Sequence, residues 1–450
     1  MIRYRARWVV PVSTEPIANG VVAVERDRIA YVGPGDAAPP GSEEDLGDVV
    51  LLPGLVNAHC HLELTAMRGF LEDIDFRRWI LRLTNARRAV LDRDALLDSA
   101  RYGIEEGLRS GITSYADTCS SGVVMQAMRE AGVRGVMYQE VFGPDPKQCA
   151  ESIDGLRGLV AGLRYLETPL VRLGVSPHAP YTVSDPLFRA TSDLAREQGL
   201  PMAIHIAESD LEHRLVVEAA GSFADGLRRR GIEVTPRGDS PVRLLARLGV
   251  LEAKPLLIHC VRVDTQDILE IATSNSAVAH CPISNAKLGH GVAPLTELLA
   301  AGVTVGIGSD SMASNNRMDI LEEERVAVLA QRARLGSSET PGAAEMLELA
   351  TIEGAKAIGI DHLVGSLDEG KQADLAAFSL DGVAPTHDPV GAAVFAIDTY
   401  RAEFVTVAGR PLVRNGRLAS PRAGLGKRME SIGDLLADWL ASGGELRGVV

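Results

Sequence analysis

The chain has 450 residues, of which 46% are apolar and 24% are charged, as in an ordinary globular enzyme. Its formal net charge of −14 argues against a nucleic-acid-binding scaffold, because such a scaffold carries a basic face. No stretch of about 18 apolar residues is present, so we expect no membrane span.

The cysteines are five in number and widely spaced, and none forms a CxxC pair: Cys60, Cys119, Cys149, Cys260 and Cys281. An odd number of dispersed cysteines is typical of reduced thiols in a cytosolic protein. Residues 1–8 are not followed by the apolar segment of a signal peptide. We therefore expect a cytoplasmic protein.

Residues 1–50 predict short strands separated by turns. The segments 21–24 and 29–32 are apolar and strand-like, and the charged residues 25–28 between them predict a turn. Residues 38–47 are rich in proline, glycine and acidic residues, which predicts a loop.

From about residue 50, short apolar runs alternate with longer helical segments. Each run is rich in Val, Ile and Leu, as expected of strands buried on both faces. The eight runs are residues 50–56, 112–116, 134–142, 171–176, 201–206, 255–259, 276–280 and 303–308. Helices are predicted at 94–109, 122–131, 185–198, 264–273 and 293–301. This alternation predicts an α/β fold, a (β/α)₈ TIM barrel; a doubly wound sheet is the alternative, but no GxGxxG follows the first run.

The β pattern returns after residue 365, in segments 365–378 and 404–413. We expect residues 1–50 and 366–425 to form a small composite β-sandwich, with the barrel at 51–365 between them. Within the C-terminal region 426–450, residues 426–443 have the periodicity of an amphipathic helix.

Six of the ten histidines stand at or just after the end of a strand-like run: His59, His61, His178, His205, His259 and His280. In a (β/α)₈ barrel the carboxyl ends of the strands meet at one rim, where active sites lie. His59 and His61 alternate along one strand and therefore face the same side. Two neutral imidazoles so placed suit a divalent metal; a chance HxH is the alternative.

Further candidate groups follow other strands. His205 ends the fifth run and could supply a third ligand, and Asp310 follows the eighth run. Burying a carboxylate directly after a buried strand costs free energy unless a partner compensates its charge, and a metal ion with its bound water would be such a partner. Glu208 could transfer protons without binding metal, and His259 could polarise the same water. The alternatives are a solvated glutamate and an ordinary core histidine.

The histidines that are not assigned to metal binding or proton transfer have less specific expected roles. His178 is a candidate substrate contact, since four ligands are already assigned, and His280 suits a structural or a substrate-lining role equally. His290 could lie in a loop over the pocket. The cysteines beside His59, His259 and His280 alternate away from the mouth and are expected to be core thiols.

These motifs together resemble those of the amidohydrolase superfamily, in the branch of cytosine, guanine and adenosine-type deaminases and triazine chlorohydrolases. Their order and spacing agree over nearly the whole chain. The anchors are PGLVNAHCHLE (53–63), SPHAPYT (176–182), HIAE (205–208), HCPISNAKLGHGVAP (280–294), GSDSMASNN (308–316), LATIEGAKAIG (349–359) and GSLDEGKQADL (365–375).

The resemblance implies one metal ion, usually zinc and sometimes iron, held by His59, His61, His205 and Asp310. Glu208 and His259 would handle protons together with Asp310, and His178 would contact the substrate. No lysine ends the fourth strand, where binuclear relatives carry a carboxylated lysine, so one ion is expected. The implied reaction is attack of hydroxide on a ring carbon, protonation of the adjacent ring nitrogen by Glu208, and loss of ammonia.

Within this branch, several segments bear on the identity of the substrate. SPHAPYT and GSDSMASNN resemble deaminases of S-adenosylhomocysteine and methylthioadenosine, and Asn315 is a further expected substrate contact. Those enzymes carry a ribose-binding glutamate after the first strand, whereas residues 75–88 contain none. HLE and FRRWI are similar instead to aminodeoxyfutalosine deaminases, whose substrate carries a benzoate. Arg87, or else Arg82 or Arg88, could pair with that carboxylate; a solvated helix face is the alternative.

The expected function is hydrolytic deamination of a 6-aminopurine nucleoside, namely aminodeoxyfutalosine, S-adenosylhomocysteine, methylthioadenosine or adenosine. The alternatives are a triazine chlorohydrolase or aminohydrolase, and a free-base deaminase of the guanine type. A non-enzymatic barrel is disfavoured because all four ligands are present. We also expect a homo-oligomer, either a dimer or a tetramer.

Overall fold

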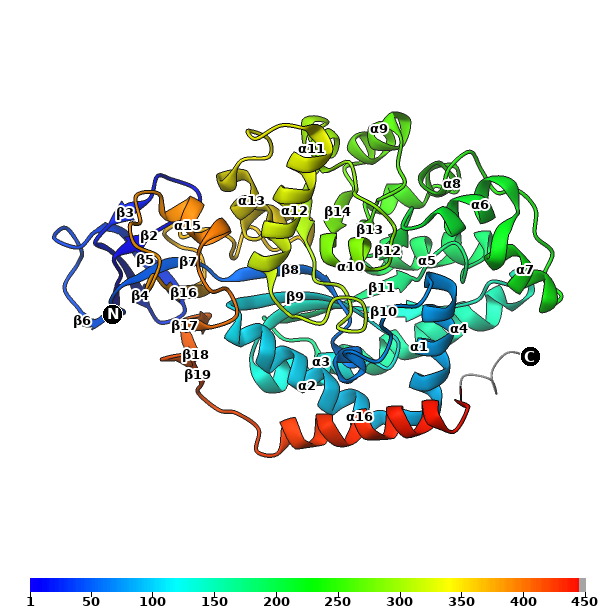
Figure 1. The fold of residues 1–450 in the computed structure, drawn as a ribbon, viewed down its shortest axis with the longest axis horizontal. Coiled ribbons are helices and arrows are strands. Elements are labelled where there is room, and N and C mark those ends of the chain that lie inside the picture. The colour runs from blue at the N-terminus through cyan, green and yellow to red at the C-terminus, as the bar shows by residue number, and fades with distance from the viewer. Residues whose placement is uncertain (445–450) are drawn as a thin grey trace.

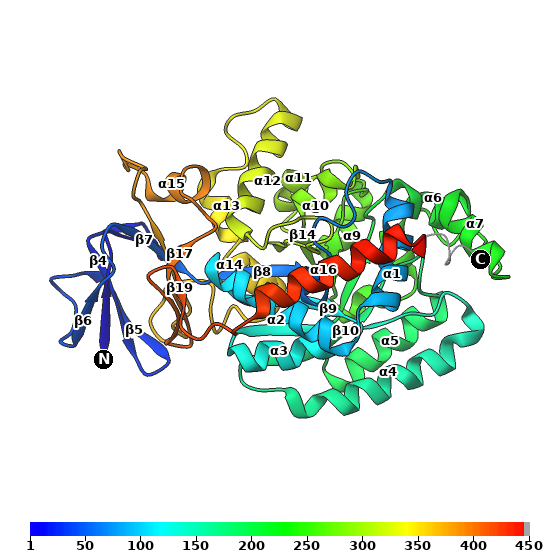
Figure 2. The same cartoon turned by 60° about the horizontal axis from the view of Figure 1, so that its bottom comes forward.

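Two β-sheets lie beside a larger barrel whose strands are surrounded by helices (Figure 1). The structure, a computed structural model, describes residues 1–444. The last helix, α16 (Leu425–Ala441), runs along the outside of the barrel and packs against α1 (Phe76–Val90) and α2 (Arg93–Arg109), as Figure 2 shows. The predicted tail at 445–450 lies outside the described residues.

Eight parallel strands form the barrel, in sequence order and in two hydrogen-bonded groups of four. Two isolated bridges, Val175 to Met202 and Cys60 to Asp310, join the groups and close the ring. The predicted (β/α)₈ fold is therefore confirmed. The strands are β8 (Leu55–Cys60), β9 (Ile112–Cys119), β10 (Arg134–Val141), β11 (Val171–Pro177), β12 (Ala203–Ile206), β13 (Leu256–His259), β14 (Ala277–His280) and β15 (Val305–Ile307).

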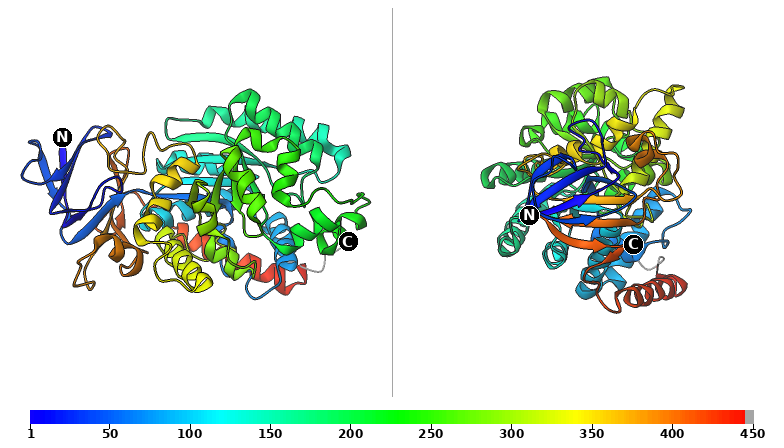
Figure 3. Two further views of the ribbon diagram at one scale, coloured as in Figure 1. Left: turned by 90° about the horizontal axis from the view of Figure 1, so that it is seen from above. Right: turned by 90° about the vertical axis from the view of Figure 1, so that its left-hand side faces the viewer.

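Helices surround these strands on the outside (Figure 3). Local sequence signals mark the ends of two of them. Helix α9 (Thr265–Ser274) begins at a reciprocal capping box between Asp264 and Asp267, and α5 (Asp185–Gln198) ends at Gly199, whose φ is 62°. The remaining barrel helices are η1 (Leu62–Met67), α3 (Val123–Ala131), η2 (Pro146–Gln148), α4 (Cys149–Leu163), η3 (Arg164–Leu166), α6 (Asp210–Glu218), α7 (Gly221–Arg229), α8 (Pro241–Arg247), η4 (Val250–Ala253), α10 (Pro282–Lys287), α11 (Leu295–Ala300), α12 (Ile320–Leu335), α13 (Ala343–Leu349) and α14 (Ile352–Ala357). Along the described chain, no helix combines the length and the apolarity needed to cross a bilayer.

Two sheets pack against each other beside the barrel, around a core that includes Tyr4, Val22, Leu51 and Phe404. In the larger sheet β7 pairs antiparallel with β16, so both ends of the chain contribute to it. The strands are β1 (Ile2–Arg5), β2 (Trp8–Val9), β3 (Ile17–Ala18), β4 (Gly20–Glu25), β5 (Arg28–Pro34), β6 (Ser42–Asp45), β7 (Val49–Pro53), β16 (Leu375–Ser379), β17 (Ala402–Val407), β18 (Arg410–Arg414) and β19 (Arg417–Leu418), with α15 (Pro389–Phe395) between β16 and β17.

Two predicted segments differ from the structure. The run at 50–56 is not one barrel strand, because β7 ends at Pro53 in the sandwich and β8 begins at Leu55 in the barrel. The apolar pattern continues across the break, which the pair Pro53-Gly54 marks; a Cβ at Gly54 would collide with Thr113. The predicted loop at 38–47 contains β6, an entirely polar strand that pairs with β1.

Candidate active site

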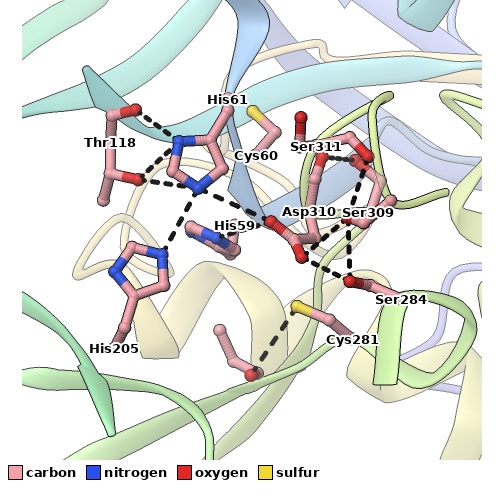
Figure 4. A network of polar contacts seen from close by, with 12 residues as sticks. His59, Cys60, His61, Thr118, His205, Cys281, Ser284, Ser309, Asp310 and Ser311 are labelled. Carbon is pink, nitrogen blue, oxygen red and sulfur yellow. Dashed lines mark hydrogen bonds and ion pairs between the residues drawn. The ribbon is translucent and has the colours of Figure 1, made fainter. Parts of the chain in front are cut away.

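Four predicted metal ligands converge at the carboxyl ends of the barrel strands (Figure 4). His59 lies in β8 and His61 follows it, His205 lies in β12, and Asp310 follows β15. The Oδ1 atom of Asp310 is 3.3 Å from Nε2 of His59 and 3.5 Å from Nε2 of His61. Nε2 of His205 is 3.3 Å from Nε2 of His61.

This group of side chains fits a divalent metal ion. Burial lowers the pKa of His59, His61 and His205, so their imidazoles stay neutral and keep free lone pairs. Apart from its contact with Asp310, the buried Nε2 of His59 has no hydrogen-bond partner among the described residues. Three imidazole nitrogens and one carboxylate oxygen form a donor set that zinc favours.

Neighbouring groups hold two of the four side chains, those of Asp310 and His61, in position. The Oδ2 atom of Asp310 accepts hydrogen bonds from Ser284 at 2.5 Å and from Ser314 at 3.1 Å. Nδ1 of His61 lies 3.0 Å from the carbonyl oxygen of Thr118. Such partners orient the first ligands of a metal and fix their tautomers. Asp310 also has a left-handed φ of 56°, and its amide donates to the carbonyl of His59, so surrounding contacts maintain a backbone conformation that costs free energy.

Glu208 follows β12 and lies between two histidines. Its Oε1 atom is 3.6 Å from Nε2 of His259 and 3.3 Å from Nε2 of His290. Burial raises the pKa of Glu208, but His259 and the hydrogen bond from His290 outweigh burial and leave its pKa below the ordinary value. Because Nδ1 of His259 faces Oδ1 of Asn285 at 3.0 Å, that nitrogen carries the proton and Nε2 is free to accept one.

A cavity of about 750 Å³ opens beside these residues, a volume in the usual range for a small-molecule site. Its walls include the predicted polar residues His61, His178, His205, Glu208, His259 and Asp310. Helix α1 covers one side with Phe76, Trp79, Ile80 and Leu83, and Phe142 and Tyr181 add further aromatic surface. The cavity therefore combines a polar floor with a large apolar wall.

The structure changes the predicted substrate contacts. Asn315 does not line the cavity, because its amide donates to the carbonyl of Ser309 and to Glu323. Arg87 does line the cavity, but its guanidinium donates to Glu63 at 2.8 Å. Arg88 reaches the rim, while Arg82 is a buried residue of α1.

The other strand-end histidines and the cysteines next to them lie where the sequence predicts. His178 lines the cavity, and its Nδ1 lies 2.7 Å from Oγ1 of Thr182. His280 is 2% exposed and is not among the lining residues, which favours its structural role. The three cysteines beside the strand-end histidines, Cys60, Cys260 and Cys281, are fully buried.

Sequence reasoning missed the roles of three acidic or basic side chains here. The sequence indicates that His290 lies in a loop over the pocket, but it does not indicate the contact of His290 with Glu208. Glu63 accepts hydrogen bonds from Arg87, Cys119 and Ser121. Glu140 lies next to the end of β10 and lines the cavity, inside a segment that the sequence marks only as an apolar run.

The chain belongs to the amidohydrolase family, whose sequence model matches residues 50–412. It is a hydrolase of that family. Among its relatives, the 5-methylthioadenosine/S-adenosylhomocysteine deaminase of Moorella thermoacetica is 33% identical over 417 residues, covering 91% of this chain and 93% of the relative.

Two solved structures show how widely the fold is shared. The adenosine deaminase of Xanthomonas campestris, with bound zinc, superposes with a TM-score of 0.84 at 27% identity and covers 97% of this chain and 98% of that one. The atrazine chlorohydrolase of Arthrobacter aurescens, complexed with zinc, superposes with a TM-score of 0.81 at 26% identity and covers 97% and 100%. Zinc in both neighbours agrees with a divalent metal site in this chain.

Proposed function

We propose that this enzyme hydrolytically deaminates a 6-aminopurine nucleoside and releases ammonia. The observation that carries the proposal is the placement of Glu208, held between His259 and His290 beside the metal-binding group. A purine ring bound in the adjoining cavity would lie next to a proton donor, Glu208, and next to the metal-binding group that would supply the nucleophile. The similarity to a methylthioadenosine and S-adenosylhomocysteine deaminase supports this substrate class.

One zinc ion is the proposed cofactor, with His59, His61, His205 and Asp310 as its ligands. When bound, zinc lowers the pKa of water and so supplies a nucleophile near neutral pH. The neutral, buried imidazoles support this assignment.

The residues of the chain supply the proton transfers. Glu208, whose lowered pKa leaves it ionised, takes one proton of the attacking water and passes it to the ring nitrogen next to the reacting carbon. Nε2 of His259 and the carboxylate of Asp310 take the other proton of the water and pass it to the departing amino group. Ammonia then leaves, and a 6-oxopurine is formed. His178 contacts the bound nucleoside, and Arg87 shapes the same wall by holding Glu63.

A triazine hydrolase is the second candidate, because the atrazine chlorohydrolase shares the whole fold. Ammonia release from adenosine, S-adenosylhomocysteine, methylthioadenosine, aminodeoxyfutalosine and guanine, and chloride release from chlorotriazines, would separate the two. We expect turnover of 6-aminopurine nucleosides. Turnover of triazines or free bases alone would contradict the proposal.

We further propose a cytoplasmic homo-oligomer, a dimer or a tetramer. All five cysteines are free and four of them are buried, which supports a reducing compartment. Light scattering on the purified protein measures the mass of the assembly, and a monomer would contradict the oligomer.

A further inference from the structure

Four carboxyl groups line the cavity, and three of them have partners. Glu63 accepts from Arg87, Glu208 faces two histidines, and Asp310 faces the metal-binding imidazoles. The fourth, Glu140, makes no side-chain hydrogen bond to any described residue, and its buried Oε1 atom has no partner. A buried polar group left unsatisfied costs free energy, so such a group in a binding cavity points to a ligand.

The position of Glu140 narrows down what it could contact. It is the next-to-last residue of β10, is 9% exposed, and is in register with Ser176 of β11, two residues before His178. One carboxyl oxygen of Glu140 and a ring nitrogen each of His178 and His205 lie within 4.8 Å of one another. Since Thr182 occupies Nδ1 of His178, the nitrogen left for a ligand is Nε2.

A carboxyl group and an imidazole together match hydroxyl groups. A hydroxyl both donates and accepts, and the two oxygens of one carboxyl group can receive two neighbouring hydroxyls. Phe142, which alternates with Glu140 on the same side of the chain, has its ring 5.1 Å from that of His178 and adds an apolar surface beside the polar pair. This combination suits a sugar ring, which has apolar C–H faces and polar edges.

We propose that Glu140, with His178, binds the adjacent 2′- and 3′-hydroxyls of a ribose and makes the enzyme selective for ribonucleosides over their deoxy analogues. This inference rests on the proposed function, because it places the sugar of the nucleoside beside β10 and β11. A site built to bind a hydroxyl rejects the analogue that lacks it, because its polar groups are then left unpaired.

The test crosses enzyme variants with substrate analogues. Glu140→Met removes both acceptors at similar volume, and Glu140→Gln keeps one acceptor. For the best nucleoside and its 2′-deoxy and 3′-deoxy forms, we expect wild-type kcat/KM to favour the ribonucleoside by about 100-fold. The preference should fall to about 5-fold or less in Glu140→Met and be intermediate in Glu140→Gln. Glu151→Gln, on the exposed side of α4, is the matched control and should retain the wild-type preference.

Two further readouts separate the possible failures. Calorimetry with the 6-oxopurine ribonucleoside product and its dideoxy form should show the same loss of selectivity in Glu140→Met, independently of turnover. An unchanged preference in that variant would overturn the inference. So would two metal ions per wild-type chain and fewer in Glu140→Met, since Glu140, His178 and His205 would then be ligands of a second ion. No turnover of any nucleoside would instead contradict the proposed function itself.

Discussion

The Nε2 atom of His290 lies 3.3 Å from Oε1 of Glu208 and reaches it from the loop after α10. The ring of Phe76, at the start of α1, packs edge-on against the same imidazole with a centroid separation of 4.4 Å. His290 therefore connects the proposed proton donor to the helix that covers the cavity.

Replacing His290 tests this connection. His290→Phe keeps an aromatic ring against Phe76 but removes the contact with Glu208. We expect kcat to fall by about 10- to 100-fold with little change in KM, because the proton donor loses its alignment while the cavity keeps its shape. Steady-state kinetics measures this split. His362→Phe, at an exposed position, is the control, and equal kcat values for both variants would contradict the role of His290.

Glu208 is expected to be needed for chemistry and not for metal binding. Glu208→Gln should keep the wild-type metal content and lose about 100- to 10,000-fold in kcat, the usual contribution of a general acid or base. Elemental analysis and ammonia release measure the two quantities on one sample. A fully active variant would show that Glu208 has been wrongly assigned.

Arg87 is expected to stabilise the protein through Glu63. Arg87→Met leaves the buried carboxylate of Glu63 without its cation, so the free energy of unfolding should fall by about 1–3 kcal/mol. Arg88→Met is the matched control, because Arg88 also lines the rim and has no ion pair within residues 1–444. Urea unfolding of the metal-loaded proteins measures both changes, and equal stabilities would contradict the predicted role of the Arg87–Glu63 pair.

The raised pKa of Glu212 predicts that the stability of the protein depends on pH. Both of its carboxyl oxygens accept backbone amides, from Ala207 at 2.8 Å and Glu208 at 2.9 Å, yet burial raises its pKa from 4.5 to about 8. The folded state therefore keeps a proton that the unfolded chain loses. This contribution to stability is complete below pH 4.5 and is lost as the pH rises to about 8.

Glu212→Gln has no proton to lose over this window. Its unfolding free energy should therefore rise relative to that of the wild type, by on the order of 1–4 kcal/mol, between about pH 5 and about pH 9. Chemical unfolding of both proteins at several pH values gives the difference. A difference that stays constant with pH would rule out this protonation change.

The barrel and the positions of the metal-binding group could be predicted because both follow from strand ends. In a (β/α)₈ barrel all strands end at one rim, so His59, His205 and Asp310 are brought together wherever the loops run. The start of the barrel was harder to locate, because one apolar run spans β7 and β8 and only Gly54 separates them.

Tertiary contacts account for what the sequence did not show. Glu140 is embedded in a predicted strand, and its exposure to the cavity depends on the side chains of neighbouring strands. Asn315 stands in a polar segment after the eighth strand, but Glu323 in α12 takes up its amide. The cavity exposure of Glu140 and the hydrogen bonding of Asn315 both depend on residues that are distant from them in sequence.

The central claim is that this enzyme replaces the 6-amino group of a purine nucleoside with oxygen from water. Its most direct test is turnover of such a nucleoside by the zinc-loaded enzyme in ¹⁸O-labelled water, with mass spectrometry of the nucleoside product and assay of ammonia. We predict one labelled oxygen at the 6-position and one ammonia per product molecule, and neither after removal of the metal. Unchanged nucleosides, with turnover of chlorotriazines alone, would contradict the account.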